Sequence, residues 1–258
     1  MKLSLEQVCF SYKKDSPVLE NISLEINSGE VTALMGANAA GKSTLLKCIF
    51  GLLGYQGKIK HQGEDLNGLT QRERTELFGY LPQDTSFQVM LTVFEAVLLG
   101  RLQSLSWKVT DENLEKVRDI MEQLDIFGLA PRYLNELSGG QKQMVSIAQT
   151  VIREPQVLLL DEPTNGLDLQ HQLEIMDFFK RITHKNRITI VALHDLNLAL
   201  KYANNLVVFQ KGKVYASGKP ETIITSDLIR EIYGVNALVN KVQGIIQVVP
   251  ISSINACH

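Results

Sequence analysis

A lysine and two hydroxyl side chains follow a loop rich in glycine and alanine, in the stretch TALMGANAAGKST. Gly36 and Gly41 flank four residues, and Lys42 and Ser43 come next, which is the spacing of a phosphate-binding loop. In such a loop backbone N–H groups point at phosphate oxygens, and the following helix directs its positive end at them. Lys42 offers a point charge for the terminal phosphates, and the Ser43 hydroxyl is a ligand for Mg²⁺. Residues 36–44 therefore predict a nucleotide site rather than a plain turn between a strand and a helix.

Two adjacent carboxylates follow a second apolar run, in the stretch VLLLDEP at residues 157–163. The run predicts a buried strand, and Asp161 stands at its carboxyl end, where open α/β sheets bind their ligands. Side chains of neighbouring strand residues point in opposite directions, and here the chain also turns at Pro163. We therefore expect Asp161 to act on the metal and Glu162 to polarise a water molecule as a general base.

The stretch LSGGQ at residues 137–141 places a hydroxyl and bare backbone N–H groups at the start of a predicted helix. The helix-dipole argument makes it a second anion site. The alternative is an ordinary helix cap, because Ser138 is of a type preferred at a helix N-terminus. Since one domain rarely needs two phosphate sites, we predict that this one serves a nucleotide bound by another copy of the chain.

The predicted strands and helices alternate, which indicates a parallel α/β core. Apolar periodicity indicates strands at residues 3–10, 18–26, 31–35, 157–161 and 187–193, the first two as an antiparallel pair. Helical spacing covers residues 42–54, 91–103, 111–127, 140–153 and 220–233. A hairpin turns at Lys211-Gly212, and a strand-like tail occupies residues 237–251. The predominantly helical block at about 88–152 interrupts the alternation and is predicted to be a subdomain.

Composition bounds the function further. The 258 residues carry 26 basic and 28 acidic side chains. This near balance gives no excess of positive charge of the kind that binds nucleic acid. No apolar stretch approaches the roughly 18 residues of a membrane span. Glu6 and Gln7 stand where a signal peptide would have apolar residues. The chain is therefore expected to stay in the cytosol.

Together the motifs resemble the ATP-binding subunit of an ATP-binding cassette (ABC) transporter, over essentially residues 1–235. GANAAGKST is similar to the family's first nucleotide motif, LSGGQ to its signature, and VLLLDEPTNGLD to its second nucleotide motif and D-loop. YLPQD resembles the Q-loop, VALHDLNLAL the switch-histidine segment, and FSYKKDSPVL the adenine-stacking strand. The resemblance implies an α/β fold, namely a P-loop NTPase core with an antiparallel β-subdomain and an inserted α-helical subdomain. Residues 236–258 would be a tail packed on that core.

The resemblance also implies a mechanism. Two cassettes would form a head-to-tail homodimer that traps two ATP molecules, with Tyr12 stacked on adenine and Glu162 activating the attacking water. The implied catalytic residues are Glu162, His194, Gln83 and Lys42, and the implied Mg²⁺ residues are Ser43, Gln83 and Asp161. The residues implied to bind ATP in their own copy are Tyr12, Gly36, Ala37, Asn38, Ala39, Ala40, Gly41, Lys42, Ser43 and Thr44. Those implied to reach the partner's ATP are Ser138, Gly139, Gly140, Gln141 and Asp168.

The cassette would need a separate integral membrane permease, which the segment from Gln83 to Arg101 would face. TVFEAVLLGR and HDLNLAL resemble the importer group for iron-siderophores, haem, cobalamin and related metal chelates, which also uses a periplasmic or surface substrate-binding protein. The chain would then work at the cytoplasmic side of the cell membrane. The alternatives are an importer cassette for another small substrate, a soluble ABC-type ATPase without a transport role, and a degenerate cassette that binds ATP without hydrolysis.

Simpler interpretations exist for single residues. Tyr12 could be a surface aromatic, Gln83 a turn residue, and His194 a histidine at a helix start, while Asp195 is expected only to cap the helix after it. Ala39 stands where the family commonly has glycine, and we expect it to lie at positive φ, which costs a non-glycine residue roughly 1–2 kcal/mol. The loop is therefore predicted to work, with weaker ATP binding or slower turnover.

Overall fold

A six-stranded sheet forms the centre of the computed structural model, which describes residues 1–13, 16–83, 90–101, 109–183 and 186–254. Its strand order is β10-β9-β3-β8-β7-β6. Five of these strands are parallel, and β10 pairs antiparallel at one edge. The strands are β3 (Val31–Gly36), β6 (Phe78–Leu81), β7 (Val157–Asp161), β8 (Ile188–Ala192), β9 (Asn205–Gln210) and β10 (Lys213–Gly218). Because both faces of this sheet are covered, β3, β7 and β8 are buried and mostly apolar at every position rather than at alternate ones.

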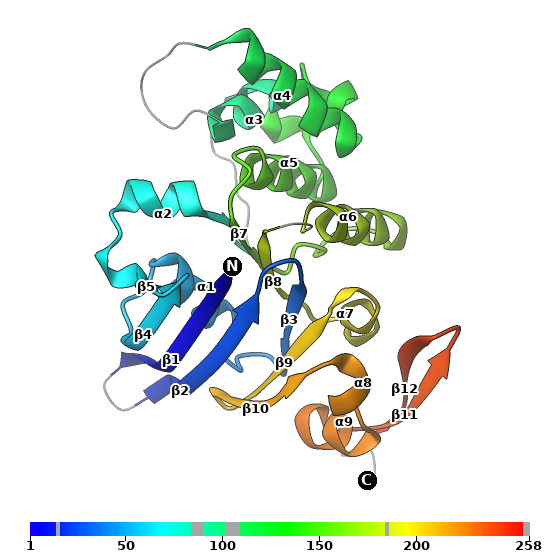
Figure 1. Ribbon diagram of the computed structural model, residues 1–258. Helices are drawn as coiled ribbons and strands as arrows, with labels where there is room; N and C mark the ends of the chain where they lie inside the picture. The colour runs from blue at the N-terminus through cyan, green and yellow to red at the C-terminus, as the bar shows by residue number, and fades with distance from the viewer. Residues whose placement is uncertain (14–15, 84–89, 102–108, 184–185, 255–258) are drawn as a thin grey trace.

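A second, antiparallel sheet lies to the left of the central sheet in Figure 1. Its strands, in the order β2-β1-β4-β5, are β1 (Lys2–Lys13), β2 (Ser16–Asn27), β4 (Gln56–His61) and β5 (Glu64–Asp65). Helix α1 (Lys42–Phe50) shares one hydrophobic cluster with both sheets, through Leu45, Leu46 and Ile49. The short helices η1 (Leu66–Gly68) and α2 (Gln71–Leu77) connect this sheet to β6.

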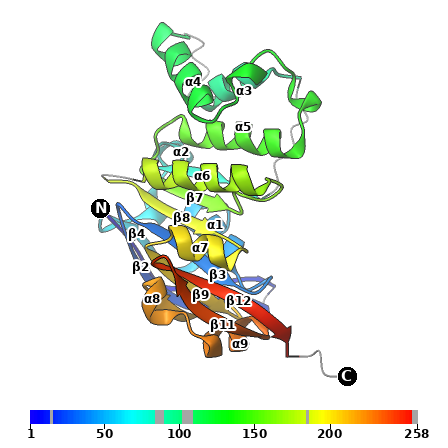
Figure 2. The ribbon, with the colours of Figure 1, turned by 90° about the vertical axis from the view of Figure 1, so that its right-hand side faces the viewer.

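Helices α3 (Val93–Arg101), α4 (Asp111–Gln123) and α5 (Gly139–Val151) form the block at the top of Figure 1. The single turns η2 (Phe127–Leu129) and η3 (Leu134–Glu136) lie between α4 and α5. Figure 2 shows α5 and α6 (Leu169–Ile182) running side by side, with α7 (Leu196–Tyr202) below them. These helices share a second hydrophobic cluster with the other face of the central sheet. Within the described ranges, no helix combines the length and apolar character needed to cross a membrane.

The C-terminal part of the chain forms a separate hairpin beside the core (Figures 1 and 2). After α8 (Pro220–Ile223) and α9 (Ser226–Tyr233), β11 (Val235–Val242) pairs antiparallel with β12 (Ile245–Ser253). The Asn197 side chain of α7 donates to the Val248 carbonyl at 3.1 Å and accepts from the Val248 N–H at 2.8 Å. This pair of hydrogen bonds holds the hairpin on the helix that follows the switch histidine.

Most predicted elements are confirmed, including the antiparallel pair at the N-terminus, the buried parallel strands and the hairpin that turns at Lys211-Gly212. The predicted end of the first helix near residue 54 is wrong, because Gly51 adopts a left-handed conformation (φ 88°) and stops the helix at Phe50. The predicted helix 111–127 is also too long, since it ends at Gln123 and Asp125 then adopts a positive φ of 54°. Residues 102 and 103 of the predicted helix 91–103 lie outside the described part of the chain.

Candidate active site

The phosphate loop leaves β3 at Gly36 and enters α1 at Lys42. A Cβ on Gly36 would lie 2.4 Å from the carbonyl oxygen of Phe209 on β9, so only glycine fits where these two strands meet. Gly41, with φ 104°, supplies the turn into the helix. Ala39 has φ 59°, which confirms the positive φ expected for this alanine.

The Lys42 side chain is buried inside the loop. Its ammonium donates to the Gly36 carbonyl at 2.7 Å and to the Ala37 carbonyl at 3.1 Å. Burial lowers the pKa of Lys42, and the nearby carboxylates of Glu162 and Asp161 oppose that shift. The lysine thus stands at the floor of the loop as a cation that phosphate oxygens would help to neutralise.

The two carboxylates at the end of β7 face different partners. The Ser43 hydroxyl donates to Asp161 Oδ1 at 2.9 Å, and Asp161 is only 1% exposed. Burial raises the pKa of Asp161, while the Ser43 hydrogen bond acts in the opposite direction. Glu162 adopts a positive φ of 53°, and its carboxylate contacts Gln83 and His194 rather than Ser43. The two carboxylates thus have different partners, while their roles on the metal and as general base stay predictions.

The Glu162 carboxylate lies between two predicted catalytic side chains. Its Oε1 contacts the His194 ring at Nε2, and its Oε2 accepts from the Gln83 amide at 3.2 Å. Asp195, next to the histidine, caps α7 by accepting from the Leu198 N–H at 3.0 Å, as expected. The loops after β6, β7 and β8 thus place Gln83, Glu162 and His194 together.

One hollow of about 420 Å³ gathers these residues with the phosphate loop. It is lined by Tyr12, Val18, Asn38, Ala39, Ala40, Gly41, Lys42, Ser43, Thr44, Gln83, Glu162 and His194. Tyr12 is 61% exposed and makes a T-shaped contact with Phe10, with ring centroids 4.8 Å apart. Its stacking on adenine stays a prediction. Val18 was not predicted as a lining residue, although its position one residue after Pro17 on the neighbouring strand was a possible signal.

The donor set fits Mg²⁺, which prefers oxygen ligands. Ser43 and Asp161 present a hydroxyl and a buried carboxylate within hydrogen-bonding distance of each other. Gln83 donates to Glu162 through its amide nitrogen, so its amide oxygen is the atom that remains for a metal. A cation here would offset the burial of the Asp161 charge.

Four signature residues, Ser138, Gly139, Gly140 and Gln141, line a different hollow of about 680 Å³, together with Gly166, Leu167 and Asp168. Ser138 and Gln141 form a reciprocal capping box, with Ser138 N to Gln141 Oε1 at 3.1 Å and Gln141 N to Ser138 Oγ at 3.3 Å. The capping interpretation of Ser138 is therefore confirmed, and its role toward a partner's nucleotide stays a prediction. Among the described residues, none lines both this hollow and the one at the phosphate loop, so the two predicted anion sites lie in separate hollows of one chain.

Asp168 caps α6 by accepting from the His171 N–H at 3.0 Å, and it also contacts the His171 ring at 2.8 Å. His171 lines the signature hollow and was not predicted as a site residue. Its position three residues after a capping aspartate is the signal that could have identified it.

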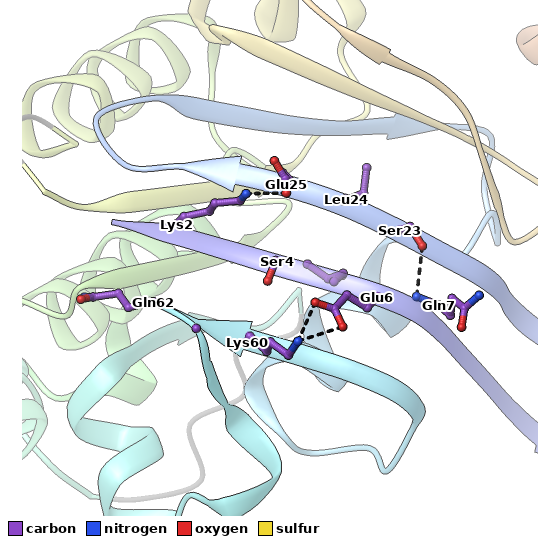
Figure 3. A pocket seen from close by; sticks show the side chains of 11 residues that line it. Lys2, Ser4, Glu6, Gln7, Ser23, Leu24, Glu25, Lys60 and Gln62 are labelled. Atoms are coloured by element: carbon purple, nitrogen blue, oxygen red, sulfur yellow. Dashed lines mark hydrogen bonds and ion pairs between the residues drawn. The ribbon is translucent and has the colours of Figure 1, made fainter.

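A larger hollow of about 880 Å³ lies on the outer face of the antiparallel sheet and holds none of the predicted site residues (Figure 3). Lys2 pairs with Glu25 there, and Lys60 pairs with Glu6 at 2.7 Å. Because carboxylates already neutralise these two lysines, the surface is a poor candidate for binding phosphate.

The comparisons with known proteins identify the family of the chain. The family model described as "ABC transporter" matches residues 19–165, and the chain belongs to this family. It is therefore an ABC-type ATPase, the ATP-binding subunit of an ABC transporter, which hydrolyses ATP to ADP and phosphate.

Individual relatives cover nearly the whole chain. An uncharacterized ABC transporter ATP-binding protein of Methanocaldococcus jannaschii is 44% identical, with 97% of this chain and 98% of that protein covered. The ferric enterobactin transport ATP-binding protein of Escherichia coli is 36% identical, with 97% and 94% covered. The fold is also similar to a dimeric ATP-binding cassette in a post-hydrolysis state with ADP and phosphate, with a TM-score of 0.76, 27% identity, and 84% and 98% covered.

Proposed function

We propose that this chain powers the uptake of a metal chelate, such as an iron-siderophore, haem or cobalamin, through a separate membrane permease. It works as an ATP-dependent homodimer in which each ATP lies between residues 36–44 of one copy and residues 138–141 of the other. The observation that carries the homodimer is that the residues of the phosphate loop and those of the signature line two separate hollows of one chain. A second copy would be needed to bring the two predicted sites to one nucleotide. The similarity to a dimeric cassette with bound ADP and phosphate supports it.

Different residues of the chain then take different roles in ATP hydrolysis. The loop N–H groups and Lys42 hold the phosphates. Ser43, Gln83 and Asp161 would hold Mg²⁺, which would supply positive charge to neutralise the phosphates. Glu162 accepts the proton of the attacking water as general base, and His194 and Gln83 keep its carboxylate in place. Closure by the partner's signature excludes water and adds N–H donors to the phosphates.

The proposed cargo is inferred from similarity to relatives rather than from a binding pocket for it, because in this proposal the cassette does not touch the transported molecule. The similarity to the ferric enterobactin transport subunit favours a metal chelate. The permease would contact the segment from Gln83 to Arg101, of which residues 84–89 lie outside the described part of the chain. A substrate-binding protein would deliver the cargo on the far side of the membrane, and the cassette would act at the cytoplasmic side.

The Glu162→Gln variant tests the dimer and the general base together. It should bind ATP, lose steady-state hydrolysis and form a dimer with ATP, while the wild-type chain without nucleotide remains monomeric. Light scattering with and without ATP measures the dimer, and phosphate release measures turnover. Undiminished hydrolysis would show that Glu162 is not the general base, and a dimer that needs no ATP would contradict the model in which ATP is held between two copies.

A separate experiment tests the cargo. A strain that lacks the gene for this chain is grown with one iron chelate at a time as the iron source, and the chelates that no longer support growth are the transported ones.

A further inference from the structure

A tyrosine near the C-terminus contacts the first glycine of the phosphate loop. The Tyr233 hydroxyl accepts a hydrogen bond from the Gly36 N–H at 3.0 Å, across 197 residues of sequence. Tyr233 is the last residue of α9 and belongs to none of the nucleotide motifs. The contact therefore links a segment outside those motifs to the point where β3 becomes the loop.

The Gly36 peptide is fixed from three directions. Its N–H donates to Tyr233, and its carbonyl accepts from the Lys42 ammonium at 2.7 Å. Its Cα lies so close to β9 that a Cβ would be 2.4 Å from the Phe209 carbonyl oxygen. Of these three restraints, only the Tyr233 hydroxyl comes from a side chain outside the sheet and the loop.

The helix that carries Tyr233 is packed firmly against its surroundings. Helix α9 buries Leu228, Ile229 and Ile232, and Gly234 ends it in a left-handed conformation with φ 66°. Strand β11 follows at once, and its partner β12 is tied to α7 through Asn197. Burial raises the pKa of Tyr233 to about 12, so the hydroxyl keeps its proton at neutral pH. It is thus a neutral acceptor held at a constant place beside the loop.

We propose that Tyr233 is a positioning residue for ATP binding, whose hydroxyl holds Gly36 so that the loop is shaped before the nucleotide arrives. A loop that is ordered in advance loses less conformational entropy on binding, so its N–H groups bind phosphate more tightly. The inference rests on the proposed phosphate-binding role of residues 36–44. It does not depend on the dimer or on the cargo.

The Tyr233→Phe variant removes the hydroxyl and keeps the ring. We expect the KM for ATP to rise about tenfold while kcat at saturating ATP stays within about twofold, because the loss concerns binding. The matched control is Tyr202→Phe, since Tyr202 is a buried tyrosine whose hydroxyl donates to the Leu173 carbonyl at 3.2 Å, away from the loop. The control should melt at a lower temperature and keep the KM of the wild type.

Two outcomes are decisive. If Tyr233→Phe lowers the melting temperature as Tyr202→Phe does and leaves the KM unchanged, Tyr233 is a packing residue and the inference is wrong. The Lys42→Ala variant separates this from a failure of the loop assignment. If Lys42→Ala binds ATP normally, the proposed role of residues 36–44 is wrong. If Lys42→Ala loses ATP binding while Tyr233→Phe keeps it, residues 36–44 bind ATP and only the proposed role of Tyr233 is wrong.

Discussion

The Ser43 hydroxyl donates to the Asp161 carboxylate at 2.9 Å, although 118 residues separate them in the chain. This hydrogen bond joins the start of α1 to the end of β7, which are also in contact as elements. It places one oxygen ligand from each nucleotide motif side by side, so a metal between them would bind both motifs at once.

The first prediction concerns the cost of burying Asp161. Asp161→Asn should abolish hydrolysis but raise the stability of the nucleotide-free protein by about 1 kcal/mol, or roughly 2–4 °C, because an amide is cheaper to bury than a carboxylate. Thermal unfolding without magnesium or nucleotide measures the gain, and phosphate release measures the loss.

The pH dependence of that gain follows from the raised pKa of Asp161. The native state holds this proton more tightly than the unfolded chain, so stability falls as pH rises above the ordinary aspartate value of about 3.9. The advantage of Asp161→Asn should therefore be full at neutral pH and shrink as the solution is acidified. A variant that melts below the wild type at neutral pH would show that the contacts with Ser43 and Lys42 outweigh the desolvation.

The second prediction concerns the alanine in the phosphate loop. Ala39 holds φ 59°, so Ala39→Gly should relieve strain of about 1 kcal/mol and raise the affinity for ATP or the turnover roughly fivefold. Titration with a fluorescent ATP analogue measures the affinity, and steady-state hydrolysis measures the turnover. Ala37→Gly is the control, because Ala37 lies in the same loop without a positive φ and should bring no gain. Equal behaviour of Ala39→Gly and the wild type would mean that the loop absorbs the alanine without loss.

The third prediction tests whether the signature acts on a partner's nucleotide. A Cβ on Gly140 would lie 3.3 Å from the Leu167 side chain, which can yield, so Gly140→Asp should fold. Its carboxylate at the start of α5 would repel phosphate, and hydrolysis should fall about 100-fold while ATP binding by the monomer is largely kept. Gly68→Asp is the control, since Gly68 has open space around it and lines neither hollow. An equal loss of ATP binding in Gly140→Asp would place the signature in the site of its own chain.

The motif chemistry could be predicted from sequence because it depends on short-range geometry. Glycines flanking four residues, a capping serine before two glycines, and a carboxylate after an apolar strand each restrict the backbone locally. Lys42, Ser43, Asp161 and Glu162 were identified in this way, and the structure brings Ser43 and Asp161 within hydrogen-bonding distance of each other. Element ends were less predictable, since the stop of α1 at Phe50 depends on one left-handed glycine.

The sequence by itself indicated the class of protein, through the resemblance of its motifs to those of the ABC family. It also indicated the alternation of strands and helices, because that follows from apolar periodicity. Only the tertiary structure decided which distant groups meet. The parallel order β9-β3-β8-β7-β6 brings Gln83, Glu162 and His194 to one edge and keeps the signature in a separate hollow. The contact of Tyr233 with Gly36 depends on where α9 packs on that sheet, and no local pattern in either segment encodes it.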